Sequence, residues 1–143
     1  MEISYSENFN ILVALITHLG ATDRASSTPT VIARKLGFEK GKVVDVVEGF
    51  PAFFRESRRT SKDEVSKGDH FYTLHMRYSR RKLDKEEDGE SQPLATDEIV
   101  MLINLVAHMV EQEQQNSRSK YTSIFTLIAA IIAAIAAIFA ALG

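Results

Sequence analysis

The feature that most constrains this chain is an uncharged, apolar run near its C-terminal end. Residues 122–142 comprise eight Ala, six Ile, two Phe, two Leu, two Thr and one Ser. As an α-helix this run would be about 31 Å long, which matches the ~30 Å hydrocarbon thickness of a bilayer. It therefore predicts a transmembrane helix over residues 122–143. A helix buried in a soluble core is the alternative, but so small a domain could hardly surround it.

The residues before the run predict its orientation. Arg118 and Lys120 precede it, and Tyr121 lies where an interfacial aromatic residue is expected. Because positive residues favour the cytoplasmic side, we expect the N-terminal part in the cytoplasm and the C-terminus across the membrane. The start of the chain lacks a basic stretch followed by an apolar core, so no signal peptide is predicted. These features are typical of a tail-anchored, single-pass membrane protein.

One side of the predicted span consists of small residues. Ala129, Ala133, Ala136 and Ala140 follow a helical spacing, and the large apolar side chains lie elsewhere. Small residues on one face let two helices approach closely in lipid, so this stripe indicates packing between spans. A plain anchor with low hydrophobicity is the alternative, and the sequence does not decide between the two.

Charge divides the chain into two parts. Residues 1–82 have 14 Lys and Arg against 10 Asp and Glu, a net of +4, whereas residues 83–143 have 3 against 9, a net of −6. The two values sum to the −2 of the whole chain. The chain has no Cys, which excludes disulfides, thiolate metal ligands and a Cys nucleophile.

Hydrophobic spacing in the first part predicts three helices and a small β-hairpin. Apolar residues recur at helical spacing over residues 8–19, and Gly20 is expected to end that helix. Thr28 is a predicted N-cap, Pro29 suits a first turn and Gly37 a left-handed end, which define a second helix. A third helix is expected over residues 39–50. Two β-segments then follow, residues 52–59 and 70–81, around a turn at Gly68.

Three helices followed by a hairpin, with Leu36-Gly37-Phe38 between the second and third helices, resemble the winged helix-turn-helix superfamily over residues 8–82. The resemblance implies a mainly α fold with a small β-hairpin. It also implies that residues 39–48 would enter the major groove of DNA and that residues 55–70 would contact the backbone.

The side chains support a nucleic-acid role only in part. Asp45 and Glu48 are expected on the exposed face of the third helix, where phosphate would repel them, whereas the hairpin is basic. The basic set has three open interpretations: a solvated face, a nucleic-acid contact, or a contact with a protein partner or the lipid surface. We favour a protein partner over DNA. The candidate contact residues are Lys40, Lys42, Arg55, Arg58, Arg59, Lys62, Lys67 and Arg77.

The domain boundaries follow from composition. A winged-helix domain is predicted over residues 1–82, and the acids, Gly89 and Pro93 of residues 83–95 predict a flexible linker. Thr96 then resembles the N-cap of an amphipathic helix over residues 96–115. Residues 116–121 are expected to connect this helix to the span.

The amphipathic helix needs a partner on one side. Ile99, Leu102, Val106 and Met109 follow a 3, 4, 3 spacing, and Asn104, His108 and Glu111 mark a polar stripe. Either the chain's own winged domain or the same helix of a second chain could cover the apolar face. We favour a homo-oligomer that associates through residues 96–142.

No catalytic motif is present. The sequence lacks a Gly-rich phosphate loop, HExxH and a nucleophile elbow, so no enzyme, cofactor or metal site is predicted. His70 and His75 are expected on opposite faces of one strand. The predicted function is a membrane-tethered, cytosol-facing winged-helix module that recruits a protein partner. The alternatives are a membrane-anchored DNA-binding transcriptional regulator and a small oligomeric subunit of a membrane complex.

Overall fold

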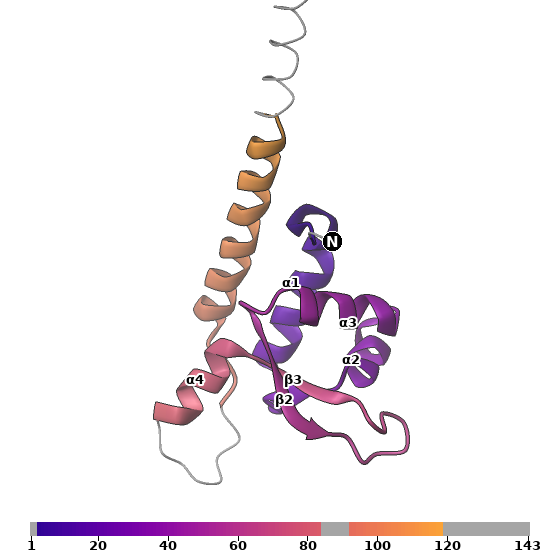
Figure 1. The fold of residues 1–143 in the computed structure, drawn as a ribbon. Coiled ribbons are helices and arrows are strands. Elements are labelled where there is room, and N and C mark those ends of the chain that lie inside the picture. Colours follow the sequence, from indigo (N-terminus) through magenta and orange to yellow (C-terminus); the bar gives the residue numbers. More distant parts are fainter. Residues whose placement is uncertain (1–2, 84–91, 119–143) are drawn as a thin grey trace, which may run out of the picture.

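In the computed structural model, residues 3–83 and 92–118 are described, and they form a mainly α-helical fold with a small sheet (Figure 1). The predicted span and its alanine stripe lie outside these residues. Within the described ranges, no helix is both long and apolar enough to cross a membrane. The elements are α1 (Tyr5–Ala21), β1 (Ser26–Ser27), α2 (Pro29–Leu36), α3 (Lys40–Gly49), β2 (Phe54–Thr60), β3 (His70–Leu74), α4 (His75–Leu83) and a helix over residues 96–118.

The sheet has three antiparallel strands in the order β1-β3-β2. The short strand β1 was not predicted; it pairs Ser26 with Thr73 and Ser27 with Tyr72. The register of β2 against β3 shifts between Glu56 and Thr60. The hairpin predicted from the sequence is therefore present and gains a third strand.

The core lies between the inner face of the sheet and the helices. Phe54, Tyr72 and Leu74 alternate toward it from the strands, as the period of two in a strand requires. The helices contribute aliphatic side chains at helical spacing, all of them buried: Leu12, Leu15, Ile16, Leu19, Ile32, Val43, Val46 and Val47.

Local signals fix the ends of α2. The Thr28 hydroxyl accepts a hydrogen bond from the Val31 N–H, Pro29 occupies the first turn, and Gly37 has φ 75° at the end. All three predicted roles are confirmed. Because an L side chain rarely adopts such a positive φ, Gly37 ends the helix where its sequence places it.

The bounds of α1 differ from the prediction. The helix starts at Tyr5, where the Ser4 hydroxyl accepts from the Glu7 N–H, three residues before the expected start. Gly20 does not end the helix but lies inside it. A Cβ at Gly20 would lie 3.1 Å from Ile99 Cγ1, so the glycine allows another helix to approach closely.

The prediction that residues 70–81 form one strand is wrong. The strand ends at Leu74, and His75, whose N–H donates to the Phe53 carbonyl at 2.9 Å, begins α4. In α4, Arg77 is fully buried, and its Nη1 donates to the carbonyl oxygens of Leu19 and Thr22, each at 2.7 Å. These carbonyls lie at the C-terminal end of α1, where a guanidinium is favourable. This contact between residues far apart in the sequence favours a helix after Leu74, although the apolar residues alternate as in a strand.

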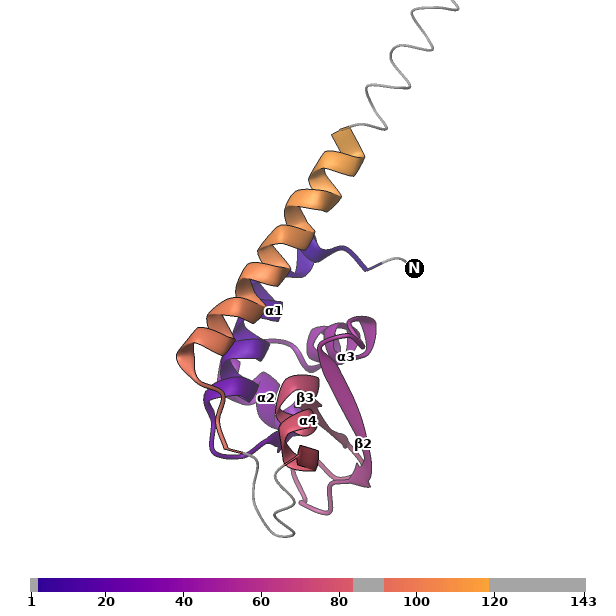
Figure 2. The ribbon, with the colours of Figure 1, turned by 90° about the vertical axis from the view of Figure 1, so that its left-hand side faces the viewer.

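The helix over residues 96–118 lies antiparallel along α1 (Figures 1 and 2). At one end, the Leu94 N–H donates to the Gly20 carbonyl at 2.8 Å, and Ile99 packs on Gly20. At the other end, the Ser6 N–H donates to Glu113 Oε2 at 2.8 Å. Val106, between the two ends, is fully buried in the common core. The chain's own domain therefore covers the predicted apolar face of this helix.

The boundaries around this helix also differ from the prediction. Leu83 belongs to α4, and Leu94 is buried against α1, so both ends of the predicted linker are structured; residues 84–91 lie outside the described part. The helix begins at the predicted residue, Thr96, but Ala95 takes the N-cap position expected for Thr96, because the Ala95 carbonyl accepts from the Ile99 N–H at 3.1 Å. It extends through residue 118, beyond the expected end at 115.

We predict that Arg77→Met lowers the free energy of unfolding by about 2 to 4 kcal/mol, because it leaves buried carbonyls at the end of α1 without a charged donor. Urea denaturation of the whole chain in a mild detergent, followed by circular dichroism, measures the change. The matched control is Arg34→Met at an exposed position of α2, which should change stability by no more than ~0.5 kcal/mol. Equal effects of the two substitutions would contradict the buried role.

We predict that acid loosens the contact between Glu113 and α1. Burial acts to raise the pKa of the Glu113 carboxyl. Hydrogen bonds from Ser6, Ser4 and the Tyr5 backbone have the larger effect and hold this pKa below its ordinary value. The carboxylate therefore stabilises the docked helix above the ordinary pKa of glutamate, and this contribution disappears as the pH falls through the lowered value.

Hydrogen exchange of the Ser6 amide measures this contribution. Between about pH 6 and pH 3, the protection factor should fall by about two- to fivefold, as expected for an exposed charge at a helix start. Glu113→Gln should show the low value already at neutral pH, whereas the control Glu111→Gln, at an exposed position, should behave as the natural chain. If Ser6 protection in Glu113→Gln depended on pH as it does in the natural chain, the pH dependence would not come from the Glu113 carboxylate.

Candidate functional site

A hollow on the surface lies between α1 and α3. It has a volume of about 810 Å³, and we call it the acidic groove. Three apolar side chains, Ile3, Ile11 and Phe38, line it together with Glu7, Asp45, Glu48, Lys42, Ser4, Asn8, Asn10 and Gly49. Three carboxylates against one ammonium group make the lining acidic, so the groove suits a cationic ligand with an apolar side.

One wall of the acidic groove is anchored to the core. The Tyr72 hydroxyl lies 3.4 Å from Glu48 Oε1 and donates to it. Burial, reinforced by the charges of Glu56 and Glu48, raises the pKa of Tyr72 to about 12. The hydroxyl therefore stays protonated and donates to the Glu48 carboxylate, and both Glu48 and Asp45 are exposed to solvent.

A second, smaller hollow of about 480 Å³ lies on the outer face of the sheet, and we call it the arginine face. Arg55, Arg58 and Arg59 line it, with the rings of Phe71 and Tyr78. The guanidinium carbon of Arg55 lies 3.5 Å from the centroid of the Tyr78 ring, a cation–π contact. The remaining lining residues are Ala25, Ser26, Glu56, Ser57 and Thr73.

The hairpin is tied to the first turns of α2 and α3. Lys40 Nζ lies 2.7 Å from Asp69 Oδ1, and Asp69 Oδ2 accepts from the Thr30 N–H at 3.3 Å and from the Thr30 hydroxyl. Burial acts to raise the pKa of Asp69, but these hydrogen bonds and the charge of Lys40 hold it below its ordinary value. Inside the loop, the Ser61 and Ser66 hydroxyls are buried and 2.8 Å apart.

The structure separates the eight predicted contact residues into five places. Lys42 lines the acidic groove, and Lys40 pairs with Asp69. Arg55, Arg58 and Arg59 come together on the arginine face, and Lys62 and Lys67 are exposed on the hairpin loop. The expectation that Arg77 belongs to the exposed basic set is wrong, because α4 turns its side chain into the interior. No single basic stripe unites the remaining seven.

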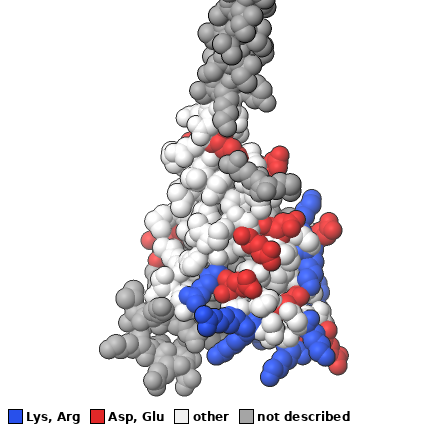
Figure 3. Space-filling model, viewed as in Figure 1, with Lys and Arg blue, Asp and Glu red and all other residues white. Residues whose placement is uncertain are grey.

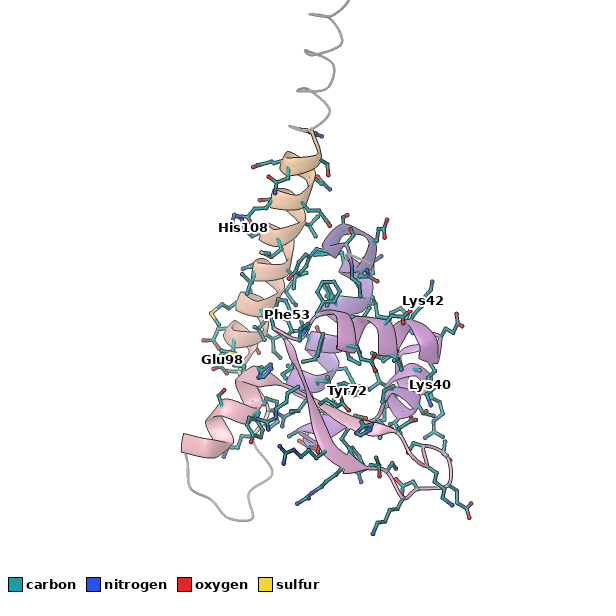
Figure 4. All side chains as sticks on the ribbon, in the orientation of Figure 1. Lys40, Lys42, Phe53, Tyr72, Glu98 and His108 are labelled. Carbon is teal, nitrogen blue, oxygen red and sulfur yellow. The ribbon has the colours of Figure 1, made fainter. Side chains whose placement is uncertain are left out.

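The charges are arranged in zones. On the face shown in Figure 3, acidic side chains gather across the middle of the domain and basic ones along the part where the sheet and hairpin lie. Figure 4 shows Lys40 and Lys42 pointing outward from α3, on the side of the molecule opposite to His108. The exposed face of α3 therefore presents Lys42 beside Asp45 and Glu48 rather than a uniformly basic surface.

The outer side of the helix over residues 96–118 keeps three exposed apolar side chains. Val100, Met101 and Leu105 have 47%, 53% and 48% of their surface exposed, and we call them the outer patch. Nearby, His108 lies 3.2 Å from Gln112 and its Nδ1 3.8 Å from Glu111 Oε2, so the predicted polar stripe is exposed. The outer patch does not belong to the face that was predicted to need a partner.

Three contributors were missed in the sequence. Phe71 and Tyr78 were not identified as neighbours of Arg55, because residues 70–81 were predicted as one strand and Tyr78 lies on α4. Glu7 was not connected with the acids of α3, since only the packing of α1 on α3 brings them together. In the described ranges, no group of three or more His, Asp or Glu side chains is arranged to hold a metal ion.

Comparison with known proteins adds no relative: no family model, no curated protein and no solved structure matches this chain.

Proposed function

We propose that this chain is a membrane-tethered, cytosol-facing winged-helix module that recruits a protein partner through the acidic groove. Three helices followed by a hairpin, the order on which the winged-helix resemblance rests, support the domain class. The uncharged run at residues 122–142 supports the tether. The observation that carries the proposal is the acidic lining of the groove beside α3. Phosphate would be repelled there, whereas a basic peptide with apolar side chains fits both rim and floor.

A second candidate function is an interaction with nucleic acid at the arginine face. Its support is the combination of three arginines with two aromatic rings, the chemistry with which proteins hold phosphates and stack on bases. Glu56 lines the same hollow and weakens this charge. Retention of DNA by the whole chain in nanodiscs, steeply reduced by salt and by Arg55→Ala, would favour this candidate over the first.

Self-association is a further part of the proposal, through the outer patch. At about 100° per residue, an unbroken continuation of the helix would place Ala129, Ala133, Ala136 and Ala140 on the side of the outer patch. The large residues of the run, among them Ile128 and Ile135, would fall on the side of Ile99 and Val106. One uncovered face would thus extend from the domain into the predicted span. A tether raises the effective concentration at which so small a patch associates.

For recruitment, we predict that a photo-crosslinking amino acid in place of Asn10, which lines the acidic groove, captures a protein in the chain's native membranes. The adduct is identified by mass spectrometry, and the purified partner is then bound to the whole chain in nanodiscs. Asp45→Lys should weaken this binding at least about tenfold, because it reverses a charge at the rim.

The matched controls lie on the hairpin loop. The same crosslinker in place of Glu64 should not capture this protein, and Glu64→Lys should leave its affinity within about twofold, as expected for an exposed position far from the contact. Equal capture at both sites, equal effects of the two lysine substitutions, or retention of DNA alone would refute recruitment through the groove.

For self-association, we predict that Leu105→Glu reduces the oligomer to a monomer in nanodiscs or mild detergent, because it places a charge in the outer patch. Ala133→Leu should act in the same direction by separating the spans. Single-molecule photobleaching counts the copies. Thr60→Glu, at an exposed position of β2, is the control. An unchanged copy number in Leu105→Glu would show that the outer patch is not part of the interface.

A further inference from the structure

The helix over residues 96–118 determines which end of the domain faces the predicted membrane. Because it runs antiparallel to α1, its last described turns lie beside the first turn of α1, where Glu113 accepts from the Ser6 N–H. The hairpin loop lies at the other end of the molecule in both ribbon views (Figures 1 and 2). A span that starts after this helix would therefore place the start of α1 toward the bilayer and the hairpin loop away from it.

The acidic groove lies at the end near the predicted span. It is lined by Ile3, Ser4 and Glu7 at the start of α1 and by Glu48 and Gly49 at the end of α3. Ile3 and Gly49 are in close contact, so the two helices meet at this corner. From Glu113 to the predicted first residue of the span, Thr122, nine residues of helix extend about 14 Å. The groove would thus open a short distance above the headgroups.

The chemistry of the groove is unusual for that position. The inner leaflet of a membrane has a negative surface potential, so a lipid-binding surface is expected to be basic. Here the groove at the membrane-proximal end is acidic, although Arg118 lies at the end of the helix, and the basic residues of the hairpin loop, Lys62 and Lys67, lie at the far end. This arrangement disfavours the lipid surface as the partner of the basic set. The lining of the groove, three carboxylates against the ammonium group of Lys42, favours a cationic occupant.

We infer that the acidic groove binds the Lys/Arg-rich cytoplasmic segment that flanks the span of another integral membrane protein. Such segments are basic because of the positive-inside rule, which holds within about 15 to 20 residues of the end of a span. Their height therefore matches the groove, and their apolar flanks fit its floor of Ile3, Ile11 and Phe38. This inference rests on the proposed recruitment function and specifies the partner as a membrane protein approached from the side.

Tethering favours a membrane-bound partner over a soluble one. When both molecules are confined to one bilayer, binding at the groove becomes an encounter in two dimensions at a raised effective concentration. A modest charge complementarity then suffices. The same basic segment without a span would have to be captured from solution, where the groove has no such advantage.

The experiment uses the whole chain in nanodiscs, with an Asn10→Cys substitution for a donor dye at the groove; the natural chain has no other Cys to label. Three acceptor-labelled probes are compared by energy transfer: a single-span peptide with a Lys/Arg-rich flank on the same side, the same peptide with Gln and Asn in that flank, and the basic flank without a span. We expect transfer with the first probe, and at least about tenfold weaker binding of the second and third.

Variants of the chain identify the groove as the contact. The triple substitution Glu7→Gln, Asp45→Asn and Glu48→Gln should reduce binding of the first probe about tenfold or more, whereas Asp63→Asn with Glu64→Gln on the hairpin loop should not. Equal binding of the first two probes, or no effect of the groove variants, would overturn the inference. Equal binding of the third probe would overturn the membrane-protein partner and leave recruitment of a basic protein standing. Failure of the crosslinking experiment at Asn10 would instead reject recruitment itself.

Discussion

The antiparallel contact between α1 and the helix over residues 96–118 is the constraint on which the arrangement of the whole molecule depends. It completes the core through Val106, and it is anchored by backbone donors at both ends, Leu94 to the Gly20 carbonyl and Ser6 to the Glu113 carboxylate. Because its two ends are held, the helix has a fixed direction relative to the domain. Without this contact, the domain would have no preferred orientation toward a membrane.

The same contact determines how the two charged surfaces would lie relative to the proposed membrane. The acidic groove lies at the corner where α1 begins and α3 ends, and the arginine face lies on the outer side of the sheet. Two surfaces of opposite sign on one small domain can serve different partners without competing. In the proposed orientation, the acidic groove faces the basic segments that flank the spans of other membrane proteins, and the hairpin loop extends into the cytosol.

The sequence predicted those parts of the fold that depend on neighbouring residues. Thr28, Pro29 and Gly37 define α2 through contacts within a few positions, and the spacing of Ile99, Leu102 and Val106 correctly indicated a covered face. Predictions failed where a distant contact decides the structure. Gly20 accommodates Ile99 from the far end of the chain, and Arg77 reaches carbonyls that it approaches only after α1 has packed. Arg55, Arg58 and Arg59 could be identified from the sequence as candidate contact residues. Their proximity to Phe71 and Tyr78, and their distance from Lys42, depend on contacts between distant parts of the chain and could not be predicted.

The geometry of the α1 contact also has a mechanical consequence. If a partner holds the domain while the bilayer pulls on residue 118 along the helix axis, the force loads the contacts at Ile99, Val106 and Glu113 in shear, all at the same time. A pull perpendicular to the axis would instead peel them apart one after another, beginning at Glu113. Contacts loaded in shear resist detachment better than contacts that are peeled apart, so the domain would withstand a pull along the helix axis better than a lateral pull in the plane of the membrane.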